Sequence, residues 1–308
     1  MSGSGAALAL GVMVARVCSR VCVVGSVNAD LTFTVSALPR PGQTVLASGL
    51  STSPGGKGGN QAVAAARAGA AVRLVAALGS DAAAEALRGH LSANGVGLDG
   101  VVTVPGPSGS AVILVDSSAE NTIVVAAGAN AALNVDSAEM RGVIADCDVM
   151  LLQLEIPLPT AIAAARVARA AGAVVIVNAS PPGAPPHELL ALSESADVVV
   201  VNETEAGEWH WPVPHLVITR GPRGASYLGD GERFVVPVPA VRAVDTTGAG
   251  DVFAGVLAAH WLDGHETALR RACAAAALST LVPGAGDCAP YAEAIDDAVS
   301  NRATERQL

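Results

Sequence analysis

The stretch Val21-Cys-Val-Val24, which ends at Gly25, decides the fold class. A short apolar run closed by glycine is typical of a parallel strand buried on both faces. Similar runs recur at residues 72–78, 149–154, 174–177 and 198–201. Segments rich in Ala, Leu and Arg lie between several of them, at residues 60–70, 81–93 and 157–171. Strands alternating with helices predict an α/β fold, in which helices cover both faces of a mainly parallel central sheet.

Two pairs of segments interrupt this alternation. Residues 31–35 with 44–50, and 110–115 with 122–126, have the β-branched content and short-period alternation of exposed strands, which predicts a small projecting β-sheet, a lid. Asp230-Gly231 predicts a further hairpin between residues 225–228 and 233–236. We expect a single domain over residues 20–300, with lid strands from about 31–50 and 110–126, because no long linker divides the chain. Residues 1–19 are expected to be a disordered N-terminal extension.

Composition excludes several classes of protein. The chain has 308 residues, 51% hydrophobic and 15% charged, which favours a large core over disorder. Its net charge of −10, without clusters of Lys and Arg, argues against nucleic-acid binding. The apolar stretch at residues 6–14 is too short to span a membrane and lacks the basic start of a signal peptide. Five cysteines without metal-binding spacing indicate reduced thiols in a cytoplasmic protein. The histidines show no metal-binding spacing either, and His210 with His215 is interpreted as part of a packed or solvated loop.

The most informative motif is Asp245-Thr-Thr-Gly248-Ala-Gly250-Asp251, which precedes an apolar segment with helical spacing. Glycines before a helix let backbone N–H groups face one point, where the helix dipole also favours an anion. A carboxylate there could take a proton from a hydroxyl while the amides stabilise a transferred phosphoryl group. The alternative is that Asp251 only caps the helix. The motif alone leaves both interpretations open.

A second glycine-rich motif is Pro54-Gly-Gly-Lys57-Gly-Gly-Asn60-Gln61. It is not a phosphate-binding P-loop, because no Ser or Thr follows Lys57 and residue 51 is Ser. Its glycines would let a small polyhydroxylated ligand approach the backbone, with Lys57 and Asn60 as hydrogen-bond donors. The alternative is a flexible turn before a helix.

Polar side chains follow three of the predicted strands. Asn28 and Asp30 come after the first strand, Glu155 after residues 149–154, and Asn202 with Glu205 after residues 198–201. Ligands bind beyond the carboxyl ends of the strands in open parallel sheets, so these side chains are expected to converge on one crevice. Each taken singly could also be an ordinary turn or cap residue.

The ordered set of motifs resembles the ribokinase family of carbohydrate kinases, also called the pfkB family, over about residues 21–289. The matching pieces are Gly25-Ser-Val-Asn28-Ala-Asp30, residues 55–63, Gln153-Leu-Glu155, Asn202-Glu-Thr-Glu205, Thr219-Arg-Gly-Pro-Arg-Gly224 and residues 245–251. Each piece is weak alone, but the ordered set is highly specific. The resemblance implies a ribokinase-like three-layer α/β/α fold, and a lid that also forms a homodimer.

The resemblance also implies roles for individual residues. The sugar hydroxyls would be held by Asn28, Asp30, Gly56, Lys57, Asn60, Glu155 and Asp251. Asp251 would be the general base, beside an anion hole formed by Gly248, Ala249 and Gly250. The nucleotide would bind at Asn202, Glu205, Thr219, Arg220, Gly221, Pro222, Arg223, Gly224 and Gly250, and Glu205 would help to place Mg²⁺ through water. A monovalent cation, usually K⁺, would bind at Asp245, Thr247, Ser279, Val282, Gly284 and Cys288.

Three features depart from the family pattern. The segment between Glu205 and Val217 is short and is expected to lack a helix, which would reshape the adenine side of the pocket. Cys273 stands where relatives often have a polar residue near the base. The segment 283–288 differs from the usual Lys-Gly-Ala pattern, which bears on cation affinity.

The resemblance implies transfer of a phosphoryl group from MgATP to the 5-hydroxyl of D-ribose, giving D-ribose 5-phosphate and ADP. A kinase for deoxyribose, fructose or a nucleoside such as adenosine is the alternative within the class. The chain has only three Phe and two Tyr to line a nucleoside pocket, which favours a small hydrophilic sugar. A non-catalytic sugar-binding regulator is the alternative outside it, because a fold does not determine a function.

Overall fold

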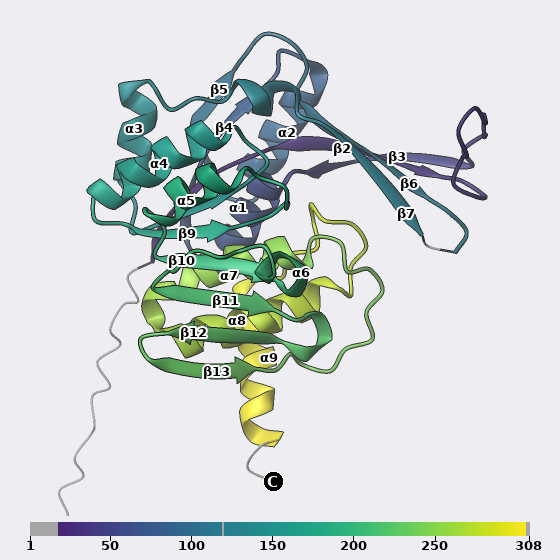
Figure 1. The fold of residues 1–308 in the computed structure, drawn as a ribbon. Helices are drawn as coiled ribbons and strands as arrows, with labels where there is room; N and C mark the ends of the chain where they lie inside the picture. The colour runs from purple at the N-terminus through teal and green to yellow at the C-terminus, as the bar shows by residue number, and fades with distance from the viewer. Residues whose placement is uncertain (1–17, 119, 306–308) are drawn as a thin grey trace, which may run out of the picture.

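The computed structural model describes residues 18–118 and 120–305, with the side chains of 301–305 excepted (Figure 1). Within these residues, nine strands form a central sheet in the order β13-β12-β11-β10-β9-β8-β1-β4-β5. The strands are β1 Arg20–Val24, β4 Ala71–Leu78, β5 Gly97–Thr103, β8 Val149–Gln153, β9 Val174–Asn178, β10 Val198–Asn202, β11 His215–Thr219, β12 Ala225–Gly229 and β13 Glu232–Val236. All neighbours from β5 to β11 pair in parallel, and β12 and β13 add an antiparallel edge.

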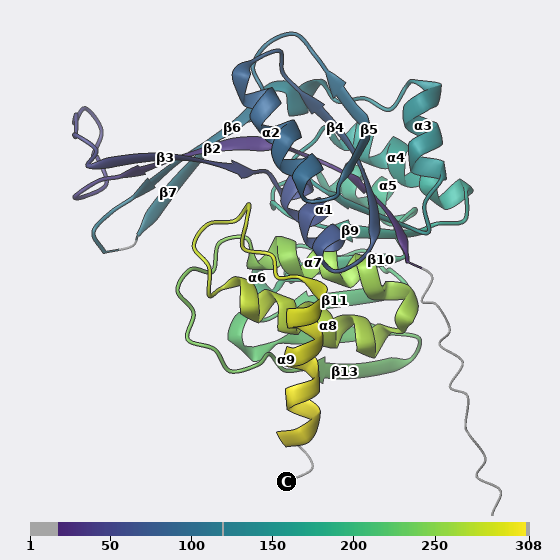
Figure 2. The same cartoon turned by 180° about the vertical axis from the view of Figure 1, so that it is seen from behind.

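Helices cover both faces of this sheet, as expected from the strand and helix alternation. Alternate residues of β1 show the reason, because Val21 and Val23 pack into one buried cluster whereas Cys22 and Val24 pack into the other. The first cluster is completed by α1 Lys57–Arg67, α2 Ala82–Ala93, α7 Ala249–His260, α8 His265–Ser279 and α9 Ala292–Glu305 (Figure 2). The second cluster is completed by α3 Ala138–Ala145, α4 Leu158–Ala170 and α5 Pro186–Ser193. The three-layer prediction is confirmed.

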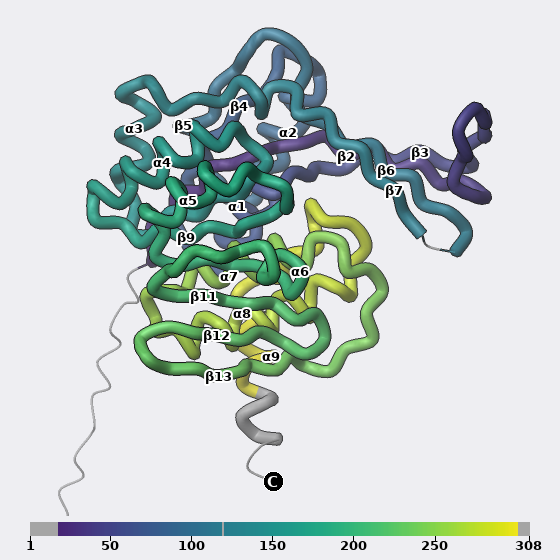
Figure 3. Tube along the Cα trace, in the orientation of Figure 1, coloured from purple at the N-terminus to yellow at the C-terminus, as the bar shows by residue number. Residues whose placement is uncertain are grey.

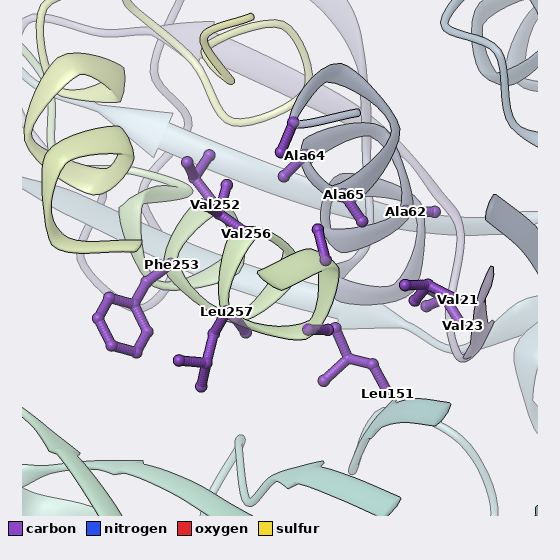
Figure 4. Close-up of a cluster of buried hydrophobic side chains, with 14 of the residues drawn as sticks. Val21, Val23, Ala62, Ala64, Ala65, Leu151, Val252, Phe253, Val256 and Leu257 are labelled. Atoms are coloured by element: carbon purple, nitrogen blue, oxygen red, sulfur yellow. The ribbon is translucent and has the colours of Figure 1, made fainter. Parts of the chain in front are cut away.

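The packing of α1 against α7 positions the candidate site. Figure 4 shows α1 and α7 side by side, with Ala64 and Ala65 of α1 next to the helix that carries Val252 and Val256. Gly255 allows this contact, because a Cβ there would lie 2.4 Å from the carbonyl oxygen of Gln61. The two helices therefore approach more closely than a side chain at residue 255 would permit.

The projecting sheet is present, with one boundary that differs from the prediction. Its strands are β2 Asn28–Thr34, β3 Gly49–Gly55, β6 Gly109–Val115 and β7 Asn121–Ala126, in the order β3-β2-β6-β7 (Figure 3). The prediction of a strand at residues 44–50 is wrong, because antiparallel pairing of Asn28 with Gly55 and of Thr34 with Gly49 places that strand over 49–55. The glycine-rich motif thus begins at the end of a lid strand.

The β12–β13 hairpin is confirmed, with Asp230 at φ 53° and Gly231 at φ 76° in the turn. Helix α2 begins as expected, because Asp81 accepts a hydrogen bond from the amide of Ala84 at its N-terminus. All five cysteines are free thiols. In the described ranges, no helix combines the length and apolar character that crossing a membrane requires. The expected extension of residues 1–19 lies outside the described residues, except for Cys18 and Ser19, and a single domain over 20–300 stays a prediction.

Candidate active site

Asp251 lies in the first turn of α7, and its side chain is buried with 7% of its surface exposed. Gly248 occupies the N-cap position at φ 80°, and no side chain caps this helix. The helix-cap interpretation of Asp251 is therefore wrong. The amides of Gly250 and Asp251 lie in the first turn, where backbone N–H groups have no acceptor within the helix. A carboxylate and unpaired amides are thus brought to one point.

Two amide side chains of α1 hold the Asp251 carboxylate. Asn60 Nδ2 donates to Oδ2 and Gln61 Nε2 donates to Oδ1, each at 3.0 Å. Gln61 is itself held, because it accepts a hydrogen bond from Gln153 Nε2 at 2.7 Å and donates to Asn178 Oδ1 at 3.0 Å. Since both partners lie at the ends of strands β8 and β9, the central sheet determines the orientation of Gln61. The Asp251 carboxylate therefore cannot turn freely.

Three further charged groups lie close to Asp251. Burial, the Glu155 carboxylate and the Asp251 carboxylate raise the pKa of Asp30 to about 7. The Asp251 carboxylate raises the pKa of Lys57, with a smaller contribution from Glu155, against the effect of burial. Glu155 Oε2 accepts hydrogen bonds from Ser26 Oγ at 2.5 Å and from the backbone amide of Lys57 at 3.1 Å. The predicted sugar-binding carboxylates and the lysine thus share one site.

Close backbone packing completes this side of the site. Gly56, at φ 84°, begins α1 against the backbone of Val27 and Asn28, where a Cβ would lie 2.7 Å from the Asn28 amide nitrogen. Asn28 is buried and accepts a hydrogen bond from Asn130 Nδ2 at 2.8 Å. Oδ1 of Asp30 is buried without a hydrogen-bond partner in the described part of the chain. An unpaired buried acceptor is costly, so a ligand hydroxyl at this place would be stabilised.

The predicted nucleotide residues lie at and after the carboxyl ends of β10 and β11, where Asn202 and Thr219 are neighbours in register, except for Gly250, which lies in the first turn of α7. Asn202 and Glu205 form a capping box at the start of α6 Glu203–Ala206, since each side chain accepts the backbone amide of the other at 2.8 Å. The short helix η2 Gly221–Arg223 follows Arg220, and Arg223 forms an ion pair with Glu203. Pro222 occupies the middle of η2, and Gly224 adopts φ 90°.

One nitrogen of this nucleotide-side group has a special position. Arg220 Nε is buried and has no hydrogen-bond partner among the described residues. The segment that carries it is held closely to the sheet edge, because a Cβ on Gly224 would lie 1.9 Å from the Val236 carbonyl oxygen. An unsatisfied guanidinium donor favours an anion nearby.

The six residues predicted to bind a monovalent cation come from two adjoining segments. Asp245 Oδ1 accepts hydrogen bonds from Thr247 N and Oγ1, at 2.8 and 2.6 Å, and Oδ2 accepts the Gly284 amide at 2.9 Å. Burial alone would raise the pKa of Asp245, but these hydrogen bonds lower it overall. Cys288 Sγ lies 3.3 Å from the Ala285 carbonyl oxygen, and burial raises its pKa to about 11.

The last two predicted cation residues flank the same loop. Val282 donates its amide to the Ser279 carbonyl oxygen at 3.2 Å, and Ser279 is fully buried. Oxygen ligands would suit a hard cation, and burial, which raises the pKa of Cys288 to about 11, disfavours its thiolate as a ligand.

The structure also places the features that depart from the family pattern. Between α6 and β11, residues 207–214 contain neither helix nor strand, as expected for this short segment. Trp209 is buried in this segment, and its Nε1 donates to the Trp211 carbonyl oxygen at 2.8 Å. Cys273 is buried in α8, and its Sγ lies 3.6 Å from the Val236 carbonyl oxygen, at the strand end that also contacts Gly224.

Sequence reasoning assigned no role to several residues that build the site. Gln61, Gln153 and Ser26 lie within the motifs but have no predicted role, and Asn178 and Asn130 lie in none of the motifs. A signal for Gln153 and Asn178 exists in the sequence, because each is the last residue of a buried apolar strand. A fully buried polar side chain needs hydrogen-bond partners, so such positions indicate a network.

Comparison with known proteins places the chain in a family. The pfkB family carbohydrate kinase model matches residues 19–292. The chain therefore belongs to the pfkB family of carbohydrate kinases.

Its relatives include ribokinases. The chain is 34% identical over 297 residues to the ribokinase of Bacillus subtilis. The aligned region covers 91% of this chain and 99% of that ribokinase. It is also 34% identical over 301 residues to a bifunctional ribokinase/ribose-5-phosphate isomerase A of Fructilactobacillus sanfranciscensis, but spans only 55% of the length of that protein. The solved structure of Arabidopsis thaliana ribokinase complexed with ribose and ATP superposes with a TM-score of 0.85 and 31% identity, over 92% of this chain and 99% of that one.

Proposed function

We propose that this chain transfers a phosphoryl group from ATP to the 5-hydroxyl of D-ribose, giving D-ribose 5-phosphate and ADP. The observation that carries the proposal is the buried Asp251, held by Asn60 and Gln61 at a glycine-capped helix N-terminus. The likeness to ribokinases, one of them solved with ribose and ATP, supports the choice of both substrates.

Asp251 is the general base in this proposal. Hydrogen bonds from Asn60 and Gln61 orient its carboxylate, which accepts the proton of the sugar hydroxyl as the hydroxyl oxygen attacks the γ-phosphorus of ATP. The N–H groups of Gly250 and Asp251, together with the α7 dipole, stabilise the negative charge on the transferred phosphoryl oxygens. The bond to the bridging oxygen of ADP breaks, and ADP leaves with the electron pair.

The sugar is held by the residues between β2 and α1. Asn28, Asp30, Lys57 and Glu155 supply donors and acceptors for hydroxyl groups, and Gly56 lets the sugar approach the backbone. The short, strongly polar side chains suit a small polyhydroxylated ligand. Closure of the small sheet over this site would exclude water that could otherwise hydrolyse ATP.

The nucleotide lies along the carboxyl ends of β10 and β11 in this proposal. Asn202 and residues 219–224 contact it, and the unpaired Arg220 Nε faces a phosphate oxygen. Mg²⁺ accompanies ATP and neutralises phosphate charge, and Glu205 would hold a water molecule of its shell. K⁺ would bind between the loops of Asp245 and Gly284, where it adds fixed positive charge beside the anion hole.

The lid also supports a proposal for assembly. Strand β7 is exposed along its whole length, and Leu46, Leu50, Ile123, Val124 and Val125 are each about half or more exposed. Exposed apolar side chains gathered on one small projecting sheet favour an interaction surface. We propose that a second copy of the chain covers them, so that two lids form a homodimer.

The proposed reaction is tested by a coupled ADP-release assay with D-ribose, deoxyribose, fructose and adenosine, each with and without K⁺. We expect turnover to be fastest with ribose and to increase with K⁺. Faster turnover with adenosine would overturn the substrate but retain the kinase, whereas ADP release that no sugar stimulates would overturn the enzyme itself.

A further inference from the structure

Three side chains that can bind a metal lie together at the start of β11. They are His215, Asp230 and His265, whose candidate ligand atoms all lie within 4.8 Å of one another. His215 begins β11, Asp230 lies in the β12–β13 hairpin, and His265 begins α8. In Figure 1 these elements meet at the end of the sheet that points away from the lid. The eleven residues from Asp251 in α7 to Trp261 at the start of η3 Trp261–Asp263 span about 15 Å, so this cluster is separate from the candidate active site.

The distances within the cluster approach those of a metal centre. Asp230 Oδ2 lies 3.9 Å from His215 Nδ1 and 3.7 Å from His265 Nδ1. Ligands of a tetrahedral Zn²⁺ site, with bonds of roughly 2.0–2.2 Å, lie about 3.4 Å apart. The two distances from Asp230 therefore exceed this value by only a few tenths of an ångström, and all three ligand atoms lie within 4.8 Å of one another.

The surrounding residues hold the two imidazoles in place. The Trp261 ring packs against His265 at 4.5 Å and against His215 at 5.4 Å, measured between ring centroids. Gly229 leaves the space that the cluster occupies, because a Cβ there would lie 2.6 Å from His215 Nδ1 and 2.8 Å from the Tyr227 hydroxyl. The positive φ of Asp230 fixes the turn that carries the carboxylate. A site built on packed rings and a defined turn is preorganised, which favours metal binding.

Hydrogen bonding in the cluster leaves a role for a cation. The Tyr227 hydroxyl lies 2.8 Å from His215 Nδ1 and 2.9 Å from His265 Nδ1. Because the hydroxyl has one proton and the Asp230 carboxylate is also within its reach as an acceptor, at least one imidazole donates its own Nδ1 proton to the hydroxyl oxygen. A metal ion would replace that proton and bind both nitrogens. The Asp230 side chain is 61% exposed, so the ion can enter from solvent.

We propose that His215 Nδ1, His265 Nδ1 and a carboxylate oxygen of Asp230 bind one divalent transition-metal ion of the Zn²⁺ class, with water as the fourth ligand. Two imidazoles and one carboxylate suit Zn²⁺ and its neighbours better than Mg²⁺, which prefers oxygen ligands. The ion would connect the β12–β13 hairpin, β11 and α8, and would stabilise the folded chain without entering the proposed phosphoryl transfer.

The test is a calorimetric titration of the whole chain with Zn²⁺ alone, in buffer without Mg²⁺ or nucleotide. All proteins carry Cys18→Ser, because the exposed Cys18 thiol is a competing ligand. The test variants are His265→Gln and Asp230→Asn. Asparagine also tolerates positive φ, so Asp230→Asn preserves the turn while removing the charge. The matched control is His187→Gln, whose side chain is 81% exposed on a different element.

We expect one equivalent of Zn²⁺ in the parent and in the His187→Gln control, with proton release and a raised Tm. Each test variant should weaken Zn²⁺ binding at least about tenfold. Even the loss of a residue that only hydrogen-bonds to a metal ligand typically weakens metal affinity by at least about this factor. Circular dichroism of the variants checks that they are folded. The proposal is overturned if the parent binds no equivalent of Zn²⁺, or if both folded test variants bind it as tightly as the parent.

Discussion

Replacing Asp251 with asparagine tests the assignment of the base directly. The variant keeps the shape of the side chain and removes its ability to accept a proton. We expect kcat for ribose phosphorylation to fall by at least about 10²-fold, as loss of a general base commonly causes. At 1.36 kcal/mol for each factor of ten, this is about 2.7 kcal/mol of lost transition-state stabilisation.

The hydrogen bonds around residue 251 predict a separate effect on folding. Gln61 cannot turn its amide, because Gln153 and Asn178 hold both ends of it, so the variant should present its oxygen to Gln61. Its amino group then faces Asn60 Nδ2, and rotation of the Asn60 amide can relieve this contact. One neutral buried hydrogen bond in place of a charged one changes the unfolding free energy by about 1–2 kcal/mol.

The assay is coupled ADP release at saturating ATP, with ribose varied so that kcat and KM are separated, and with urea unfolding as a check on the folded fraction. Asp297→Asn, on the exposed surface of α9, is the matched control and should match the unmodified chain. A folded Asp251→Asn variant with near-normal kcat would refute the role of Asp251. A fall in kcat that follows the folded fraction would instead indicate a structural role.

Three further predictions concern pH, packing and assembly. The pKa of Asp30 is raised to about 7 in the folded chain, against about 4 in the unfolded chain, so ionisation of Asp30 should destabilise the fold increasingly as pH rises from 4 to 7. Asp30→Asn should therefore raise Tm at pH 8 but not at pH 4. An equal change in Tm at both pH values would contradict this prediction. Gly255→Ala should lower the free energy of unfolding in urea by about 1–3 kcal/mol and lower kcat, because its Cβ would push α1 and Gln61 away. In the control Gly142→Ala a Cβ meets nothing, so the free energy of unfolding should rise by up to about 1 kcal/mol. Similar free energies for the two variants would refute the close-packing argument. Light scattering should show a dimer that Val124→Asp converts to a monomer, and a monomeric parent would exclude the proposed assembly.

The lid strand shows where prediction from sequence alone fails. The β-branched content of residues 44–48 suggested a strand, but the observed strand begins at Gly49. Intrinsic preference for β structure is weak, and pairing decides register. Here β2 pairs with residues 49–55, which draws the start of the glycine-rich motif into the sheet.

The amide network shows a different limit. Gln61, Gln153 and Asn178 lie far apart in the chain, and only the parallel pairing of β8 with β9 and the packing of α1 bring them to Asp251. The His215, Asp230 and His265 cluster has the same origin, since its spacing of 15 and 35 residues matches no metal-binding motif. No local pattern indicates which residues make these contacts with one another.

The sequence by itself determined the layered α/β architecture, the glycine-rich start of the helix that carries Asp251 and the polar residues at strand ends, because these follow from local periodicity and backbone geometry. Only the tertiary structure decided that Asp251 is a held carboxylate rather than a helix cap, and that Asp30, Lys57 and Glu155 lie close enough to shift one another's ionisation or share hydrogen bonds. The physical reason is that electrostatic and hydrogen-bond energies depend on distances of a few ångströms between residues that are distant in the chain.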